Sequence, residues 1–183
     1  MFEDLIARIA RELKTAELAY MIIGGQAVLL YGTPRMTKDI DITLGVDVGQ
    51  LGNLLPVIDA VGLEIIPENS RSFVEQTSVL PTRERESGIR VDFIFSFTPY
   101  GRQANSRSKA VSLCGTNVMF ASAEDVIIHK IFAGRPRDYE DVRSILLKNP
   151  DLDIMYLKKW LREFEKSPEK KGLLGAFEEL LLG

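Results

Sequence analysis

The clearest candidates for chemistry are two aspartates, Asp39 and Asp41, in a run rich in β-branched residues over positions 37–44. In a strand, side chains two positions apart point to the same face, with backbone positions about 6.5–7 Å apart. Both carboxylates can therefore converge on one cation or bridge two. The chain has one cysteine and one histidine, which excludes a Cys/His zinc site. Oxygen ligands favour Mg²⁺ or Mn²⁺.

A glycine pair, Gly24 and Gly25, ends the short apolar run at positions 20–23, upstream of the aspartates. Glycine has no side chain, so backbone N–H groups there can approach a phosphate closely. The sequence therefore predicts that a phosphate and a metal ion bind in one place.

A third acid, Asp92, lies in a run that alternates between large apolar and other residues, so it points away from the hydrophobic face formed by Val91, Phe93 and Phe95. If this strand lies beside that of Asp39, two cations can bind among the three carboxylates, polarise the α-phosphate of a nucleotide and activate an attacking hydroxyl. We expect Asp41 to bridge the cations and Asp39 to lie on the triphosphate side. Asp92 would hold the cation of the attacking oxygen and accept its proton.

These residues are positioned by alternating helices and strands, then hairpins, then helices. Periodicity and cap signals predict helices at 2–16, 26–31, 48–60, 122–133, 138–148, 154–166 and 173–182. Strands are expected at 20–23, 39–44, 63–66, 73–80, 89–97, 110–113 and 117–120. The fold class is thus α/β (α+β), with a mixed-sheet core at 1–121 and a helical C-terminal part at 122–183.

The composition is that of an ordinary soluble protein: 183 residues, 45% hydrophobic and 27% charged, with a net charge of −3. No apolar run is long enough to span a membrane, and the acidic N-terminus differs from a signal peptide, so we expect a cytoplasmic protein. The single cysteine excludes an intrachain disulfide. The net charge argues against coating nucleic acid through bulk charge. Residues 71–109 carry seven basic against four acidic side chains, which indicates either a solvated loop surface or a patch that faces nucleic acid.

In combination, the motifs resemble the nucleotidyltransferase superfamily that includes DNA polymerase β, and most closely its AbiEii toxin-like branch. The resemblance covers about residues 20–145. It rests on the glycine pair and the aspartates together with Gly32, Arg35, Thr37, the 123–130 run and the 135–141 run. It implies metal-dependent transfer of a nucleotide from a nucleoside triphosphate to RNA, such as the 3′ end of tRNA, or to a protein hydroxyl. It also implies a possible toxin–antitoxin role with a cognate antitoxin.

Three further residues are candidate nucleotide ligands. Many members of the superfamily have serine where Gly25 stands, so Thr37 is the candidate to supply a hydroxyl instead. Arg35 and Lys130 are candidate phosphate ligands, since guanidinium and ammonium groups suit phosphate oxygens. Asp138 and Asp141 are explained as a helix start, but the resemblance implies that they lie near Lys130 and organise it. For Lys130 the alternative is a lysine whose stem lies along an apolar helix surface and whose charged end reaches water.

Two other functions remain open at this stage. One is a non-catalytic regulatory or antitoxin module with the same fold, against which the three intact acids argue. The other is a metal-dependent glycosyltransferase that uses Asp39 and Asp41. It is weakened because only 38 residues precede Asp39, too few for the usual nucleotide-binding region.

Overall fold

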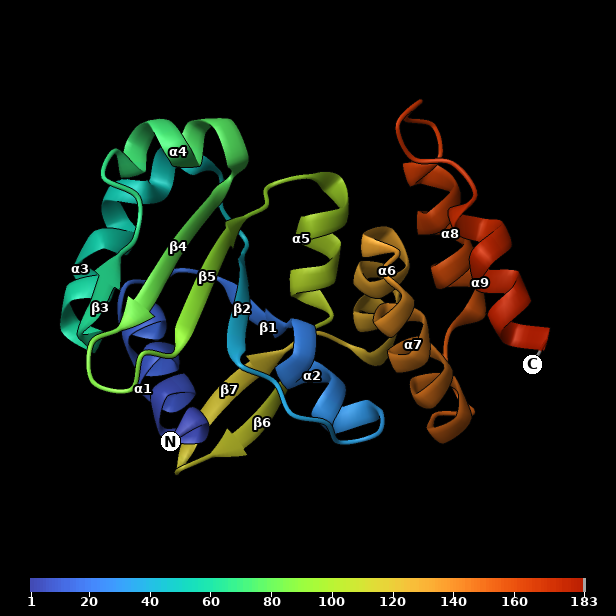
Figure 1. The fold of residues 1–183 in the computed structure, drawn as a ribbon, viewed down its shortest axis with the longest axis horizontal. Coiled ribbons are helices and arrows are strands. Elements are labelled where there is room, and N and C mark those ends of the chain that lie inside the picture. Colours follow the sequence, from blue (N-terminus) through green and yellow to red (C-terminus); the bar gives the residue numbers. More distant parts are fainter. Residues whose placement is uncertain (183) are drawn as a thin grey trace. The chain divides into compact units, whose positions relative to one another are not determined.

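The computed structural model describes residues 1–182, which form two compact units (Figure 1). The first unit consists of residues 1–26 and 37–121 and contains all the β-strands of the described chain. The second consists of residues 27–36 and 122–182 and is helical. None of the described helices is long and apolar enough to cross a membrane.

The first unit is built on a seven-stranded mixed sheet with the order β3-β4-β5-β2-β1-β7-β6. β2 is central, antiparallel to β1 and parallel to β5. The neighbouring strand β7 is parallel to β1, whereas the β3–β4, β4–β5 and β6–β7 pairs are antiparallel. The strands are β1 (Tyr20–Ile23), β2 (Asp39–Leu44), β3 (Leu63–Ile65), β4 (Val79–Glu84), β5 (Arg90–Phe95), β6 (Lys109–Leu113) and β7 (Thr116–Phe120).

Amphipathic helices bury their apolar faces within this unit. Helix α1 packs against α3 and against β6 and β7. Its buried residues, among them Leu5, Ile9 and Leu13, recur at the spacing of one helix face. The other helical elements of the unit are η1 (Val48–Gln50), α3 (Leu51–Val61), α4 (Ser70–Thr77) and α5 (Pro99–Ser106), and α1 spans Phe2–Thr15.

The fold class agrees with the prediction, but two local predictions were wrong. The expected strand at 73–80 is mostly helix α4, and the strand that pairs with β5 is β4, most of which lies between the strands predicted at 73–80 and 89–97. The side chain of Asn69 accepts a hydrogen bond from Ser72 N and so caps α4, which the apolar pair Phe73–Val74 had obscured. Helix α5 was not expected, although Thr98 at its N-cap and Pro99 behind it are typical helix-start residues.

The second unit contains most of α2 (Gly24–Tyr31) and the helices α6 (Ala123–Ala133), α7 (Pro136–Lys148), α8 (Ile154–Phe164) and α9 (Leu173–Leu182). As predicted, Ser122 caps α6, accepting a hydrogen bond from Asp125 N, and Gly134 ends it in a left-handed conformation. Helix α6 packs against α7, α8 and α9. Trp160 of α8, the only tryptophan in the chain, is buried.

Residues 27–36 are held by α7 through a series of polar contacts. Lys148 Nζ donates to the carbonyl oxygen of Gly32 at 2.8 Å, and Asn149 Nδ2 donates to that of Tyr31 at 2.9 Å. Thr33 N donates to Ser144 Oγ at 3.1 Å. This explains why a segment that lies between the glycine pair and β2 in the sequence belongs to the second unit.

The turn between β6 and β7 contains Cys114 and Gly115, both with positive φ angles. The Cys114 thiol is exposed and lies 3.4 Å from Asp4 Oδ1. This hydrogen bond and the acidic charges of Asp4 and Glu3 raise the pKa of the thiol.

Candidate active site

The three predicted acids come together through the pairing of β2 with β5. Asp41 lies directly beside Asp92 in the parallel register, and Asp39 lies beside Arg90. The alternate residues of both strands are buried on the opposite face, Ile40, Ile42, Val91 and Phe93 among them. The period-2 pattern therefore leaves one face of these two strands to charged groups, as expected from the sequence.

The glycine pair makes room for two of the predicted site residues. Gly24 has φ +65°, and a Cβ atom there would lie 2.0 Å from Asp41 Oδ2. A Cβ atom at Gly25 would lie 2.4 Å from Thr37 Oγ1. Both glycines begin helix α2, whose first backbone N–H groups have no partners within the helix. The pair thus brings the N-terminus of α2 next to a carboxylate and a hydroxyl.

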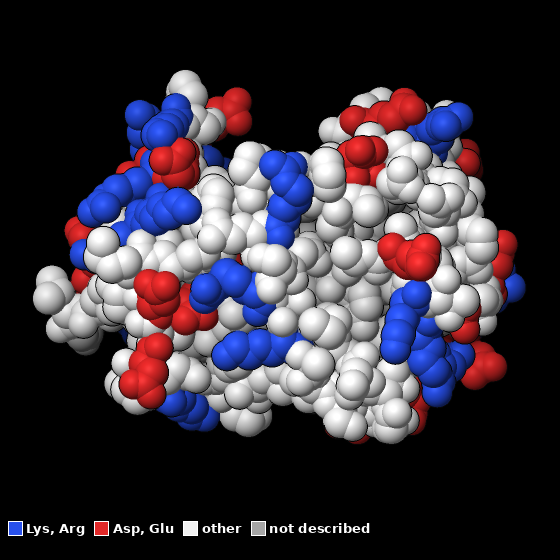
Figure 2. All heavy atoms as spheres, turned by 180° about the vertical axis from the view of Figure 1, so that it is seen from behind, with Lys and Arg blue, Asp and Glu red and all other residues white. Residues whose placement is uncertain are grey.

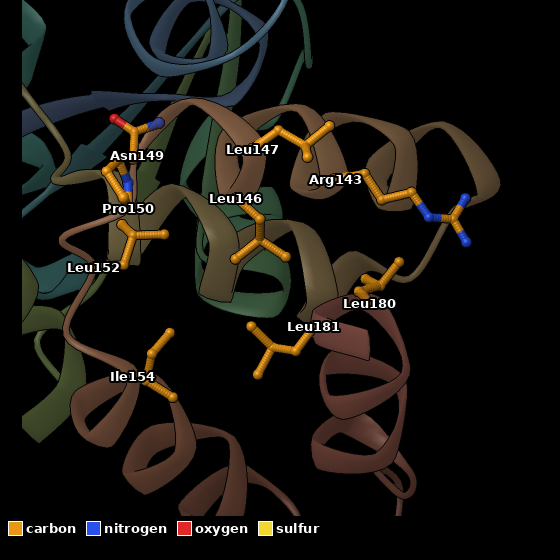
Figure 3. A pocket seen from close by; sticks show the side chains of 9 residues that line it. All are labelled: Arg143, Leu146, Leu147, Asn149, Pro150, Leu152, Ile154, Leu180 and Leu181. Carbon is orange, nitrogen blue, oxygen red and sulfur yellow. The ribbon is translucent and has the colours of Figure 1, made fainter. Parts of the chain in front are cut away.

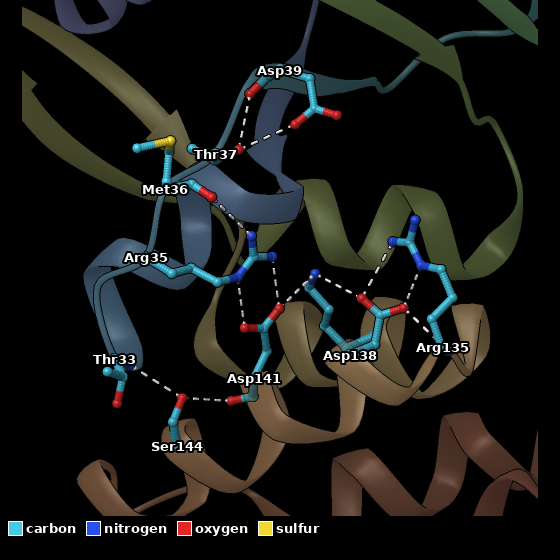
Figure 4. A network of polar contacts seen from close by, with 10 residues as sticks. Thr33, Arg35, Met36, Thr37, Asp39, Arg135, Asp138, Asp141 and Ser144 are labelled. Carbon is cyan, nitrogen blue, oxygen red and sulfur yellow. Dashed lines mark hydrogen bonds and ion pairs between the residues drawn. The ribbon is translucent and has the colours of Figure 1, made fainter.

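Thr37 orients Asp39. Its hydroxyl donates to Asp39 Oδ1 at 3.1 Å and also lies 3.4 Å from the carbonyl oxygen of Asp39 (Figure 4). In this structure the hydroxyl that was predicted to contact a phosphate is therefore engaged with a carboxylate. Its role toward a nucleotide stays a prediction.

Asp92 is paired with a residue that was not among the predicted site residues. Arg90 Nε donates to both Asp92 oxygens, at 2.9 and 3.0 Å. The hydrogen bond to Asp92 and the negative charges of Asp92, Asp39 and Asp41 raise the pKa of the Arg90 guanidinium. The signal was present in the sequence, because Arg90 and Asp92 stand two apart in a strand and must share a face.

The donor set suits a hard divalent cation, but its side chains are not gathered around one. Asp39, Asp41 and Asp92 supply only carboxylate oxygens, the ligands that Mg²⁺ and Mn²⁺ prefer. Within residues 1–182, however, no three His, Cys, Asp or Glu side chains are arranged to hold a metal ion. The residues present therefore fit such a cation by type and by strand register, and both Asp92 oxygens accept from Arg90 Nε in this structure.

In the second unit, Lys130 is buried rather than placed along a solvent-exposed surface. Its ammonium lies 2.9 Å from Asp138 Oδ1 and 2.9 Å from Asp141 Oδ2, and the side chain is only 6% exposed. The alternative of a lysine that reaches water along the helix surface is therefore wrong. Its partners come from α7, one helix later in the chain, and their place near Lys130 agrees with what the family resemblance implied.

Arg35 extends this ion-pair network (Figure 4). Its Nε and Nη2 donate to the two Asp141 oxygens, each at 2.9 Å, while Arg135 Nε donates to Asp138 Oδ2 at 2.6 Å. Burial alone would raise the pKa of Asp141, but the hydrogen bonds and charges of Arg35 and Lys130 outweigh it and lower that pKa. Arg135 and Lys130 likewise lower the pKa of Asp138. The predicted phosphate ligands Arg35 and Lys130 thus share one carboxylate.

The second unit also contains a mainly apolar pocket of about 320 Å³ beside α7 and α9 (Figure 3). None of the predicted site residues lines it. Arg143 is the one charged side chain among its lining residues, which are Arg143, Leu146, Leu147, Asn149, Pro150, Leu152, Ile154, Leu180 and Leu181. It offers no cluster of groups for acid–base or metal chemistry.

Comparison with known proteins supports the nucleotidyltransferase prediction. Residues 96–172 match the model of a family described as a nucleotidyltransferase of unknown function (DUF6036). The matched part contains Lys130, Asp138 and Asp141 but none of the three strand acids. The family match is therefore independent of Asp39, Asp41 and Asp92. A search of curated proteins gave no match.

Solved structures with the same fold are nucleotidyltransferases or resemble them. The solution structure of the antibiotic-resistance factor ANT(2'')-Ia has 17% identity and a TM-score of 0.60, covering 90% of this chain and 91% of that chain. The crystal structure of ANT(2'')-Ia with adenylyl-2''-tobramycin has the same identity and TM-score, covering 90% and 97%. An antigenic nucleotidyltransferase-like protein from Paracoccidioides brasiliensis has 19% identity and a TM-score of 0.59, covering 95% and 92%. The chain therefore has the nucleotidyltransferase fold, while the AbiEii branch stays a prediction.

Proposed function

We propose that this chain is a divalent-metal-dependent nucleotidyltransferase, which transfers a nucleoside monophosphate from a nucleoside triphosphate to an acceptor hydroxyl. The observation that carries the proposal is the in-register pair of Asp41 and Asp92 on neighbouring parallel strands, with Asp39 on the same strand face and Gly24 against the Asp41 carboxylate. The family match to residues 96–172 and the shared fold support the same class of reaction.

In this proposal Asp39, Asp41 and Asp92 hold Mg²⁺ or Mn²⁺, which when bound neutralises phosphate charge and polarises the α-phosphate. The N–H groups at the start of α2 donate to phosphate oxygens, and Thr37 keeps Asp39 oriented. Asp92 accepts the proton of the acceptor hydroxyl. The oxygen then forms a bond to the α-phosphorus, and the bond to pyrophosphate breaks. Arg35 and Lys130 are proposed as further phosphate ligands.

For the acceptor we favour the 3′ end of an RNA, with a protein hydroxyl next. Basic residues lie near Asp92 both in the sequence and in the sheet. Arg90 stands two residues before Asp92, and Arg83 of the neighbouring strand β4 lies opposite Arg90. The face drawn in Figure 2 carries Lys and Arg side chains interspersed with Asp and Glu. If RNA is the acceptor, transfer should weaken steeply as salt is raised, because phosphate contacts release counterions.

A small-molecule acceptor is the second candidate, because the similar fold of ANT(2'')-Ia was solved with an adenylylated aminoglycoside. A toxin–antitoxin role with a cognate antitoxin, and cytoplasmic location, stay predictions from the sequence. A non-catalytic module would bind nucleotide without transferring it.

The test is incubation of the protein with each labelled triphosphate, Mg²⁺ or Mn²⁺, and total RNA, total protein or an aminoglycoside. We expect label on RNA, with transfer lost in Asp41→Asn and Asp92→Asn. Asp59→Asn, on an exposed position of α3, is the control and should keep full activity. Normal transfer by Asp41→Asn would refute the proposal, while label only on protein or aminoglycoside would change the acceptor alone.

Binding and turnover separate the roles of the acids. Asp39→Asn and Asp41→Asn should lose the metal-dependent part of the affinity for a nonhydrolysable triphosphate in calorimetry. Asp92→Asn should bind within a few-fold of wild type but turn over poorly, since its carboxylate acts mainly in the transition state. Normal turnover in Asp92→Asn would make Asp92 a structural residue.

A further inference from the structure

Four charged residues form a two-by-two array on one face of β2 and β5. Asp39 lies opposite Arg90, and Asp41 lies opposite Asp92. Arg90 is the one cation among three carboxylates in this array. Three neighbouring carboxylates without a counter-ion would repel one another, because like charges directly opposite on paired strands are destabilising.

The array directs Arg90 toward Asp92. Arg90 Nε donates to both carboxylate oxygens of Asp92. On the β4 side, the residue opposite Arg90 is Arg83. Repulsion between these like charges favours a guanidinium of Arg90 that points toward Asp92. The Asp92 side chain is only 17% exposed, whereas Arg90 is 53% exposed and so can move into solvent.

The same contact involves the two Asp92 oxygens that a cation would bind. Both Asp92 oxygens face the Arg90 guanidinium, so the carboxylate is turned along its own strand rather than toward Asp41 across the pair. A cation held jointly by Asp41 and Asp92 needs at least one of those oxygens.

We propose that Arg90 is the built-in counter-ion of this site, and that Arg90 has to leave Asp92 when a divalent cation binds there. The exchange lowers the cation affinity of the free protein: Arg90 competes with the cation for Asp92 and compensates the charge of Asp92 when no cation is bound. Arg90 is thus a positioning residue for Asp92. This inference rests on the proposed function, because it takes Asp92 as a cation ligand.

The first experiment measures Mn²⁺ binding to the nucleotide-free protein by electron paramagnetic resonance. Arg90→Met removes the competing guanidinium and should bind Mn²⁺ about five-fold more tightly, the factor that corresponds to about 1 kcal/mol for a partly exposed ion pair. Arg83→Met is the matched control, since it removes a neighbouring positive charge that lies one strand further from Asp92. It should change the affinity less than about two-fold, as long-range charge effects are screened.

The second experiment uses the wild-type protein and so does not depend on a folded variant. The Nε–Hε signal of Arg90 in a ¹H–¹⁵N spectrum, assigned by its loss in Arg90→Met, should move when Mg²⁺ is added. An Arg90 signal that stays in place at saturating Mg²⁺, or equal Mn²⁺ affinities for Arg90→Met and Arg83→Met, would overturn the proposal.

The two proposals fail differently. If wild type transfers nucleotide and Mg²⁺ leaves the Arg90 signal in place, the enzyme assignment stands and the counter-ion role falls. If neither wild type nor Arg90→Met binds Mn²⁺ and no transfer is seen, both fall.

Discussion

At Gly24 a carboxylate occupies the space that any other side chain would need. A Cβ atom at this position would lie 2.0 Å from Asp41 Oδ2, and the backbone is in the left-handed region at φ +65°. A substitution therefore strains the backbone and displaces Asp41 at the same time. The glycine is required both by the turn into α2 and by the acid beside it.

Gly24→Ala should therefore lose metal-dependent nucleotide binding and cost about 1–2 kcal/mol of stability for the left-handed backbone alone. Calorimetry with a nonhydrolysable triphosphate and urea unfolding followed by circular dichroism measure the two effects. Gly52→Ala is the control: no atom lies within 4 Å of its added Cβ, and helix α3 favours alanine there by up to about 1 kcal/mol. Full nucleotide binding by Gly24→Ala would show that Asp41 can be moved without consequence.

At the scale of elements, α6 and α7 are joined by a buried ion-pair network rather than by apolar packing alone. Asp141 accepts from Lys130 of α6 and from Arg35 of the 27–36 segment. Its lowered folded-state pKa means that the ionised form stabilises the second unit at pH values above the unfolded pKa of about 3.9. This contribution is lost as the pH falls below that value and through the lower folded pKa.

We expect Asp141→Asn to lower the free energy of unfolding at pH 7 by about 3 kcal/mol, because Lys130 and Arg35 lose a buried partner. The difference from wild type should shrink toward pH 3, where Asp141 is protonated in the unfolded chain. Urea unfolding followed by the fluorescence of Trp160 reports on the second unit. Asp151→Asn, at an exposed position of the same unit, should change little; a pH-independent difference for Asp141→Asn would contradict the ion-pair explanation.

The sequence predicted the elements whose signals are local. The alternation around Asp39 and Asp92 predicted two strands with acids on one face, and Ser122 with Gly134 predicted the ends of α6. Local patterns could not predict the burial of Lys130, because Asp138 lies on another helix and its contact depends on how α6 packs on α7. The family resemblance did imply that Asp138 and Asp141 lie near Lys130. The Arg90–Asp92 pair is predictable from spacing, because residues two apart in a strand share a face.

At the scale of the whole molecule, the first unit is discontinuous in sequence. The chain leaves it after residue 26, returns at residue 37 and leaves again after residue 121. The excursion over residues 27–36 separates the glycine pair from β2, so both motifs of the proposed site are covalently connected to a segment of the second unit. A single division of the chain at residue 121 assigns residues 27–36 to the first unit, whereas they pack with the second.

A fragment of residues 1–121 should therefore keep the 27–36 segment without its partners on α7. In amide hydrogen exchange, Thr33 should lose the protection that Ser144 gives its N–H group in the whole chain. The amides of strand β2 should remain protected in the fragment, because their hydrogen bonds are made within the sheet. The full chain under the same conditions is the control, and retained protection at residue 33 in the fragment would contradict the role of α7.

The chain also contains a natural pair of spectroscopic labels. Cys114 is its only cysteine and is exposed on the β6–β7 turn of the first unit, and Trp160 is the only tryptophan and is buried in the second. A maleimide dye on Cys114, attached at mildly alkaline pH because Asp4 raises the thiol pKa, can accept excitation energy from the indole. Resonance energy transfer between these two side chains can therefore be recorded during a nucleotide titration, without altering a single residue.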